Sequence, residues 1–246
     1  MDYLKFSVGN AKINQFIAIF DIVAGVCCPF AKDCLSKADR FTGKITDGKD
    51  TKFRCFSAST ECLRARVRAL RWYNYLLLKN ADNIQELIQN SIDNTAVKNA
   101  SKFRIHTSGD FFSQEYFNAW LEIAKNSPKI VFYAYTKSLP FWIEKINEIP
   151  ENFVLTASKG GTHDKLIKEF NLKYAEVVFS EEEAEEKGLE IDHDDSLAYS
   201  NGKSFALLLH GVQPAKSEAS KAFQLLKKKG IAGYRKEVKK RIGVKV

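Results

Sequence analysis

The chain has no cysteine after Cys62, no histidine before His106 and no hydrophobic run that approaches the ~20 residues of a membrane span. Its first residues, MDYLK, include no apolar signal stretch, so we expect a protein of a reducing, cytosolic compartment. A disulfide framework is therefore the least expected use of its cysteines. With 246 residues and 45% hydrophobic composition, the chain has enough apolar material for a core without covalent staples.

What the sequence does contain is a local group of thiols. All its cysteines lie between residues 27 and 62, and they are Cys27, Cys28, Cys34, Cys55 and Cys62. Such clustering is what a metal centre requires, because several thiolates must converge on one small object. The alternative is that the cysteines fill the core as small hydrophobes, which suits Cys27 after the apolar run 22–26.

The spacing of the cysteines indicates which metal to expect. Five residues separate Cys28 from Cys34 and six separate Cys55 from Cys62, whereas structural zinc sites usually present pairs separated by two to four. Iron–sulfur clusters accept more varied spacings. We therefore predict a [4Fe–4S] cluster held by Cys28, Cys34, Cys55 and Cys62, with zinc as the less favoured metal. The fourth ligand stays open between Cys62, Cys27, a non-cysteine group and no protein group.

The second part of the chain alternates between strand and helix patterns. Short apolar runs predict strands at residues 103–107, 129–135, 153–157, 174–179 and 205–209. Helical patterns follow at 113–125, from 139, at 162–170 and at 217–229, and the acidic run 181–186 is typical of a solvated helix face. Such alternation predicts an α/β fold with a parallel sheet, and this number of strands favours an open, partial βα barrel.

The first hundred residues are expected to differ from the rest. Helical spacing at 61–79 and a short pattern at 83–89 predict a mainly helical segment, 1–100, that carries the cluster. Residues 101–246 would then form the partial barrel with a basic C-terminal helix. We expect the two parts to make one compact unit.

Polar residues gather where the predicted strands end. In parallel βα folds these ends carry the chemistry. The candidate catalytic or substrate-binding residues are His106, Ser108, Asp110, Lys137, Ser158, His163 and His210. Serine, threonine and glycine are also ordinary turn formers, so each residue alone is weak evidence and the set is the stronger argument.

Several motifs resemble one known family. They are Cys28-Pro29-Phe30-Ala31-x-x-Cys34, Phe53-Arg54-Cys55-Phe56 before an arginine-rich helix, and the run from Arg104 to Ser113. Together they resemble the bacteriophage proteins named after gene product 88, over nearly the whole chain. The resemblance implies a phage origin, action in the cytoplasm of the infected bacterial host, and importance for Cys28, Cys34 and Cys55. It also implies that the position of Cys62 need not hold cysteine, which makes a three-cysteine site a serious alternative.

Three thiolates beside a partial βα barrel are also similar to radical S-adenosylmethionine enzymes. The C-x3-C-x2-C loop of that family is absent, so the likeness is one of architecture alone. It makes S-adenosylmethionine a possible cofactor. Gly160 and Gly161, after the third strand, would let a cofactor approach the backbone closely. The leading hypothesis is thus a cluster-dependent enzyme of unknown reaction.

The charge balance supports an alternative function. The net charge is +8 and the isoelectric point is about 9.1. Basic residues crowd the helix after the cysteines and the C-terminus, which is typical of proteins that bind DNA or RNA, although solubility alone explains such charge as well. The candidate contacts are Arg64, Arg68, Lys227, Lys228 and Lys229. The basic C-terminal stretch also includes Arg235, Lys236, Lys239, Lys240 and Arg241.

A hydrolase is the second alternative. His106, His163 and His210, with Ser108, Ser138 and Ser158, could supply a base and a nucleophile, and an open cluster iron could act as a Lewis acid. The sequence contains no G-x-S-x-G elbow. We expect no membrane partner; a small molecule, a nucleic acid or a protein partner fits the composition.

Overall fold

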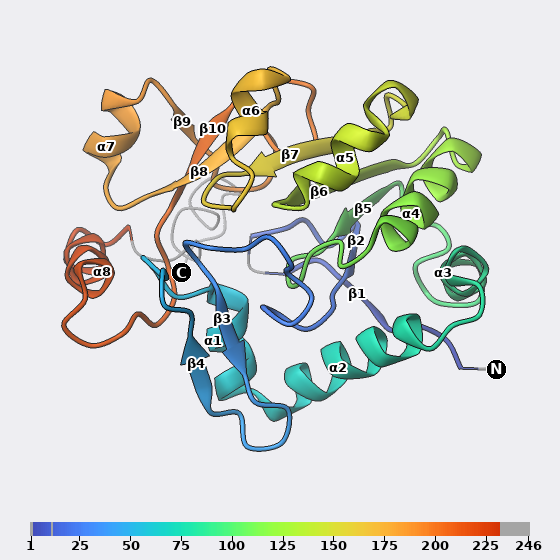
Figure 1. Cartoon of the computed structure of the whole chain (residues 1–246), viewed down its shortest axis with the longest axis horizontal. Helices are drawn as coiled ribbons and strands as arrows, with labels where there is room; N and C mark the ends of the chain where they lie inside the picture. Colours follow the sequence, from blue (N-terminus) through green and yellow to red (C-terminus); the bar gives the residue numbers. More distant parts are fainter. Residues whose placement is uncertain (1, 11, 232–246) are drawn as a thin grey trace.

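The computed structural model describes residues 2–10 and 12–231, which fold around one large sheet (Figure 1). The eight strands of this sheet are β1 (Phe6–Val8), β2 (Ile17–Phe20), β5 (Lys102–Ile105), β6 (Val131–Thr136), β7 (Phe153–Ser158), β8 (Tyr174–Val178), β9 (Glu190–Ile191) and β10 (Phe205–Leu208). A separate antiparallel hairpin joins β3 (Ser36–Ala38) to β4 (Ile45–Asp47). The fold is therefore mixed α/β with a mostly parallel sheet.

The strand order follows the chain across most of the sheet. It runs β1-β2-β5-β6-β7-β8-β10-β9, and β1 alone pairs antiparallel with its neighbour. The predicted parallel strands are confirmed as β5, β6, β7, β8 and β10. The sheet also takes β1 and β2 from the segment expected to be mainly helical. Their short sequences, FSV and IAIF, show too few residues for a period of two to be recognised.

The helices lie close to where the sequence patterns place them. They are α1 (Phe56–Leu63), α2 (Ala65–Lys79), α3 (Ile84–Asp93), α4 (Gln114–Asn126), α5 (Leu139–Glu144), α6 (Lys165–Glu169), α7 (Glu181–Glu186) and α8 (Glu218–Lys228), with a 3-10 turn at Ile146–Glu148. Ser113 caps α4, because its Oγ accepts a hydrogen bond from the Tyr116 amide at 3.2 Å. The helix expected from residue 61 is instead two helices, since Arg64 between them is extended.

One face of the sheet packs against helices and is almost wholly aromatic and aliphatic. Phe20, Phe103 and Phe132 lie on this face, and Trp120 of α4 packs against Phe20 and Phe132 with ring centroids 5.7 and 6.1 Å apart. Figure 1 shows α4 and α5 running along this side of the strands. These side chains belong to the largest apolar core of the described residues. This core fixes the strands whose carboxyl ends carry the polar residues.

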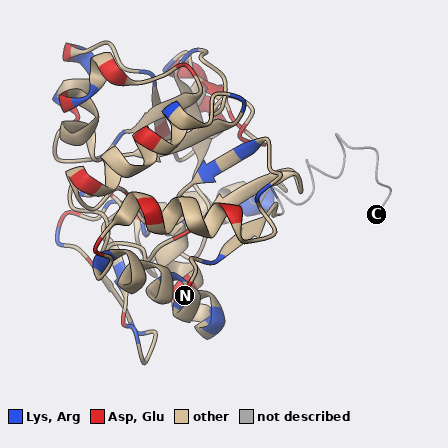
Figure 2. Ribbon diagram, turned by 90° about the vertical axis from the view of Figure 1, so that its right-hand side faces the viewer, with Lys and Arg blue, Asp and Glu red and all other residues tan. Residues whose placement is uncertain are grey.

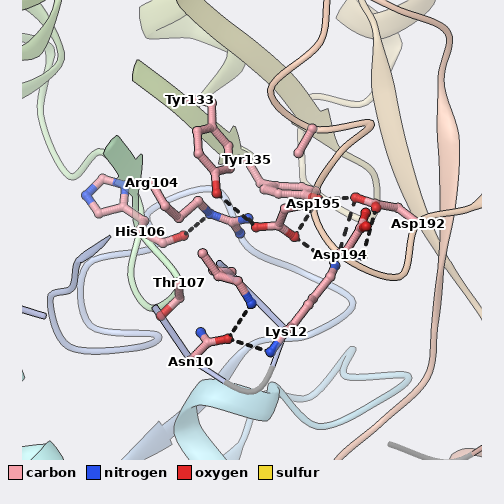
Figure 3. A network of polar contacts seen from close by, with 12 residues as sticks. Asn10, Lys12, Arg104, His106, Thr107, Tyr133, Tyr135, Asp192, Asp194 and Asp195 are labelled. Carbon is pink, nitrogen blue, oxygen red and sulfur yellow. Dashed lines mark hydrogen bonds and ion pairs between the residues drawn. The ribbon is translucent and has the colours of Figure 1, made fainter. Parts of the chain in front are cut away.

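The opposite face holds a buried network of charges (Figure 3). Arg104 of β5 forms an ion pair with Asp195, and the Arg104 guanidinium lies 4.0 Å from the centre of the Tyr135 ring. Lys12 Nζ lies 2.7 Å from Asp195 Oδ1, and Tyr133 donates a hydrogen bond to Asp195 Oδ2 at 3.3 Å. These contacts hold the segment around Asp195 and the turn near Lys12 against the sheet.

We expect Arg104→Met to lower the free energy of unfolding by about 3 kcal/mol, because it leaves a buried carboxylate short of its main counter-charge. Urea denaturation measures the change. Lys145→Met is the matched control, since Lys145 Nζ pairs with Glu148 at 3.0 Å on the surface and such pairs contribute at most about 1 kcal/mol. Equal losses for the two variants would contradict a stabilising role for the buried network.

Candidate functional site

The segment 22–34, which we name the cysteine loop, lies over the carboxyl end of β7. The Lys32 and Asp33 amides donate to the carbonyl of Gly160 at 3.3 and 2.9 Å, and the Thr162 amide donates to the carbonyl of Phe30 at 2.9 Å. In Figure 1 this segment, in blue, lies between the sheet and the α1, β3 and β4 elements. Cys28 and Cys34 are therefore placed at the edge of the sheet where parallel βα folds carry out chemistry.

The glycines after β7 explain how the loop comes so close. Gly160 has φ +97°, and a Cβ there would lie 3.0 Å from the Cβ of Asp33. A Cβ on Gly161 would lie 3.1 Å from the carbonyl oxygen of Phe30. The sequence suggested that these glycines admit a cofactor. In the structure they admit the backbone of the cysteine loop.

Cys55 lies near the same end of the sheet but belongs to a different segment of the chain. It is the residue that precedes α1, and α1 is tied to the sheet by hydroxyl groups. Ser57 Oγ donates to the carbonyl of Thr107 after β5 at 2.7 Å, and Ser59 Oγ donates to the carbonyl of Val212 after β10 at 3.2 Å. The Arg54 amide donates to Gln213 Oε1 at 2.7 Å. The third thiol is thus held between the ends of β5 and β10.

Burial and nearby charges act on the thiols of Cys28 and Cys55. Burial raises the pKa of Cys28, and the charges of Asp110, Cys55, Cys27 and Cys34 raise it further. Burial, followed by the charge of Cys34, raises the pKa of Cys55 to about 11. A cation beside Cys28 and Cys55 would oppose these effects and favour their thiolate forms.

Cys27 and Cys62 have other surroundings. Cys27 is fully buried in the apolar core, in line with its alternative reading as a small hydrophobe. Cys62 lies on the β3–β4 side of α1, where its charge acts on Arg54 and its carbonyl lies next to Gly43. Among residues 2–10 and 12–231, no group of three or more His, Cys, Asp or Glu side chains is arranged to hold a metal ion.

A buried ionic network joins the cysteine loop to the sheet. Arg71 of α2 contacts Asp21 Oδ2 at 3.0 Å and Glu61 Oε1 at 3.2 Å. Asp21 Oδ1 accepts hydrogen bonds from the Thr107 amide at 2.8 Å and the Ser108 amide at 3.0 Å. Sequence reasoning chose Ser108 and overlooked Asp21, Glu61 and Arg71. Asp21 directly follows β2, so recognising that strand would have placed this carboxylate at the sheet edge.

Asp110, Lys137 and Ser158 form a second network at this edge. Asp110 Oδ1 accepts from Thr136 Oγ1 at 2.6 Å, and Asp110 Oδ2 accepts from the Lys137 amide at 2.8 Å. Burial raises the pKa of Asp110 to about 6. Lys137 Nζ donates to Ser158 Oγ at 2.7 Å and to the carbonyls of Ser158 and Lys159 at 2.8 and 2.9 Å. These three acceptors engage all three donors of an ammonium group, so the Lys137 side chain is fixed against the end of β7.

The three predicted histidines lie in three different environments. His106 is buried, and burial lowers its pKa to about 3. His163 lies against Phe30 of the cysteine loop, with ring centroids 4.8 Å apart. His210 lies against Phe56 of α1 at 4.5 Å, and burial lowers its pKa to about 4. The latter two border the cysteine-bearing segments, whereas His106 belongs to the aromatic core.

The predicted nucleic-acid contacts also differ from one another in exposure and in hydrogen-bond partners. Arg64 is exposed, whereas Arg68 is buried and donates to the carbonyls of Arg40 and Phe41 at 3.0 and 3.4 Å. Lys227 and Lys228 end α8, and Lys229 Nζ lies 2.6 Å from Glu182. The basic residues from Arg235 to Arg241 lie outside the described residues.

The fold and the site define an α/β protein whose mostly parallel sheet carries a cysteine-bearing loop at its carboxyl edge. The chain belongs to the gene product 88 family, whose sequence profile matches residues 4–227. It is 27% identical over 143 residues to the Gene 88 protein of Mycobacterium phage L5. It is 26% identical over 149 residues to the Gene 88 protein of Mycobacterium phage D29.

Each of these matches covers 53% of this chain and 60% of the relative. No solved structure matches the chain. In the part of the chain that the structure describes, no helix has the length and apolar character needed to span a membrane. The family resemblance drawn from the motifs is confirmed, and the relatives are bacteriophage proteins.

Replacing His106 should change the pH dependence of stability. The pKa of its imidazole is lowered in the folded state, so the unfolded chain binds the extra proton and wild-type stability falls as pH falls from about 6.5 towards 3. His106→Asn, which tolerates the φ of +68° at this position, should flatten that slope by up to about 1.4 kcal/mol per pH unit. Urea denaturation at several pH values measures it. Tyr116→Phe, which removes the 2.8 Å partner of His106 Nε2 and keeps the imidazole, should retain the slope.

Proposed function

We propose that this chain binds a [4Fe–4S] cluster through Cys28, Cys34 and Cys55. The observation that supports the proposal is the docking of two cysteine-bearing segments at the carboxyl ends of the strands, the cysteine loop through the carbonyl of Gly160 and the start of α1 through the carbonyl of Thr107. Local spacing alone does not bring them together, since the cysteine loop and the start of α1 are tied to different strands. The spacing of the cysteines also favours a cluster over zinc.

The backbone around Cys28 suits a bound anionic cluster. The Gly25 amide donates a hydrogen bond to Cys28 Sγ at 3.3 Å, and the neighbouring Ala24 amide donates to Glu61 Oε1 at 2.9 Å. Successive amides of this kind form concave anion sites that recur at iron–sulfur centres. Gly25 has φ +70°, and a Cβ there would lie 2.2 Å from the carbonyl oxygen of Ser36. Only glycine fits this position, so the backbone conformation that directs these two amides depends on Gly25.

We further propose that the protein is a cluster-dependent enzyme of the host cytoplasm. Three thiolates leave one iron for another ligand, and such an iron can bind S-adenosylmethionine as co-substrate. The strand order from β2 to β10 follows the chain without reversal, which favours an open βα barrel over a doubly wound sheet. Asp110, with its raised pKa, is the side chain we expect to exchange a proton near the cluster.

Nucleic-acid binding is the second candidate, and one surface favours it. A groove of about 500 Å³ lies along α2 and is lined by aromatic residues, among them Phe41, Trp72 and Tyr73. The guanidinium of Arg40 lies 5.3 Å from the Phe41 ring centre and 5.4 Å from that of Trp72. The sequence of α2, ARVRALRWYNYLLLK, contains no acidic residue. Aromatic and cationic groups together suit the bases and phosphates of a single strand. In the view of Figure 2, acidic and basic residues are both scattered over the ribbon.

Anaerobically purified protein should absorb broadly near ~400 nm, as iron–sulfide charge transfer does in [4Fe–4S] proteins. Cys28→Ser, Cys34→Ser and Cys55→Ser should each remove most of this absorption, because each thiolate holds one iron. Cys27→Ser is the matched control and should keep it, since Cys27 lies in the apolar core. Iron and sulfide analysis completes the measurement. A colourless wild-type protein with one zinc per chain would falsify the cluster.

The nucleic-acid candidate predicts a salt effect from basic residues near the groove, of which Arg40 lines it and Arg64 and Arg66 lie at the start of α2. Replacing Arg40, Arg64 and Arg66 with glutamine should reduce the slope of log affinity against log salt by about two units for a single strand, near 0.7 per lost phosphate contact. Fluorescence anisotropy with a labelled oligonucleotide measures the slope. Glutamine at Lys227, Lys228 and Lys229 serves as the comparison and should leave it unchanged. If the α8 variant alone alters the slope, the interface lies on α8 and not along the groove.

A further inference from the structure

We propose that the groove along α2 accepts the unpaired bases of a single-stranded nucleic acid, and that one base stacks on the ring of Phe41 in the turn between β3 and β4. The inference rests on the nucleic-acid candidate described above and is independent of the proposed cluster. It names the form of nucleic acid that this surface binds and the side chain that distinguishes a single strand from a duplex.

Phe41 is apolar, aromatic and exposed. Of its surface 80% is accessible, the highest fraction among the exposed large hydrophobic side chains of the described residues. A single exposed apolar side chain is ordinary on a protein surface. Phe41, however, lines the same groove as Trp72, Tyr73 and Leu76. A continuous exposed apolar surface of this kind is typical of a binding site.

The turn that carries Phe41, residues 39–43, has a fixed backbone. The Phe41 amide donates to Asp39 Oδ1 at 3.1 Å, and the Thr42 amide donates to the same oxygen at 2.8 Å. Buried Arg68 of α2 donates from Nε to the carbonyl of Arg40 at 3.0 Å and from Nη2 to that of Phe41 at 3.4 Å. Both backbone groups of Phe41 are therefore bonded, which lowers the cost of ordering this turn around a ligand.

One guanidinium group links this turn to both neighbouring helices. Arg68 belongs to α2, and its Nη1 donates to the carbonyl of Glu61 in α1. Gly43 leaves room for it, because a Cβ on Gly43, which has φ +73°, would lie 2.6 Å from Arg68 Nη1. The sequence suggested Arg68 as a direct nucleic-acid contact. In the structure it is a positioning residue, since its donors are directed at three backbone carbonyls.

The floor of the groove is one side of α2. The residues of this helix that line it recur at helical spacing, and they are Ala69, Trp72, Tyr73, Leu76, Leu77 and Asn80. Such spacing gives a continuous strip about 16 Å long. The Arg40 guanidinium lies 5.3 Å from the Phe41 ring centre and 5.4 Å from that of Trp72, so it is near aromatic rings of both segments. Aromatic rings and guanidinium planes are the surfaces on which unpaired bases stack.

The charges around the groove favour a nucleic acid as its occupant. Arg64 and Arg66 are exposed at the start of α2, and Lys79 is exposed at its end. Among the described residues that line the groove, none is acidic. A second copy of this chain would set like charges against one another, whereas phosphates would be attracted. Bases inside a duplex are covered by their neighbours, so a ring such as that of Phe41 can stack only on an unpaired base.

The first test measures, by fluorescence anisotropy, the binding of labelled thymidine and uridine oligonucleotides of about 12 nucleotides and of a DNA duplex of equal length. We expect the single strands to bind more tightly than the duplex. Phe41→Leu should weaken single-strand binding by about 5- to 150-fold, the equivalent of one lost stacked base. It should keep the slope of log affinity against log salt, because no phosphate contact is lost. Phe41→Tyr, which retains an aromatic ring, should bind as wild type. Phe16→Leu is the matched control, since Phe16 is 72% exposed and lies before β2, outside the groove.

A second readout locates the bound strand. Trp72 is partly exposed, whereas the other tryptophans, Trp120 and Trp142, are buried in the core. An oligonucleotide in the groove should therefore quench the fluorescence of Trp72 alone, and the quenching should disappear in Trp72→Phe. Quenching that persists in this variant would place the strand elsewhere and overturn the inference.

The remaining outcomes separate the inference from the function on which it rests. Wild-type affinity in Phe41→Leu, or an equal loss in Phe16→Leu, would overturn the stacking role of Phe41 while nucleic-acid binding stands. If polyglutamate displaces the bound oligonucleotide as readily as an unlabelled strand does, the groove attracts acidic chains by charge alone and the inference fails. A wild-type protein that binds none of the oligonucleotides instead refutes the nucleic-acid candidate itself.

Discussion

The interaction on which the candidate site depends is the pairing of buried Arg71 with two carboxylates. Arg71 on α2 contacts Asp21 at the end of β2 and Glu61 on α1, and Glu61 in turn accepts from Ala24 of the cysteine loop. Removing one partner of such a group leaves an uncompensated buried charge and costs about 3–5 kcal/mol. Three elements must therefore dock on the sheet together. The position of Cys28 relative to Cys55 follows from this docking, because each belongs to a segment that the network fixes.

The same constraint explains why the cysteine-bearing segment needs little regular structure. Residues 22–34 form no helix and no strand of the main sheet, and their backbone amides bond instead to Gly160 and to one another. Side chains and carbonyls from the strand ends replace the hydrogen bonds that a neighbouring strand would have supplied. A loop fixed in this way can follow an irregular path over the ends of the strands. Its conformation depends on glycine where the chains approach most closely, at Gly25 and Gly160.

Most of the fold could be predicted from periodicity, and the site only in part. β6 and β7 are buried on both faces and read as continuous apolar runs, whereas β2 has four residues and carries no usable period. Cys28, Cys34 and Cys55 stood out because cysteine is rare in the chain. Glu61 did not, because a glutamate beside Cys62 on a helix resembles any solvated residue. His106 was expected at the rim, yet its left-handed backbone and its Tyr116 partner belong to the core. Burial of a polar side chain is decided by tertiary contacts that no local pattern encodes.

Burial and the charges around the thiols of Cys28 and Cys55 disfavour their thiolate forms. The pKa of Cys28 is raised by burial first and then by Asp110 and other thiols, and that of Cys55 is raised to about 11 by burial and Cys34. The nearby cations are already committed, Arg71 to Asp21 and Glu61, and Lys137 to Ser158 and Lys159. In the proposed function, a bound metal would supply the counter-charge for these thiolates and take the place of their protons. Because the thiols come from segments that dock only in the folded chain, metal affinity and the stability of this edge of the sheet should be linked.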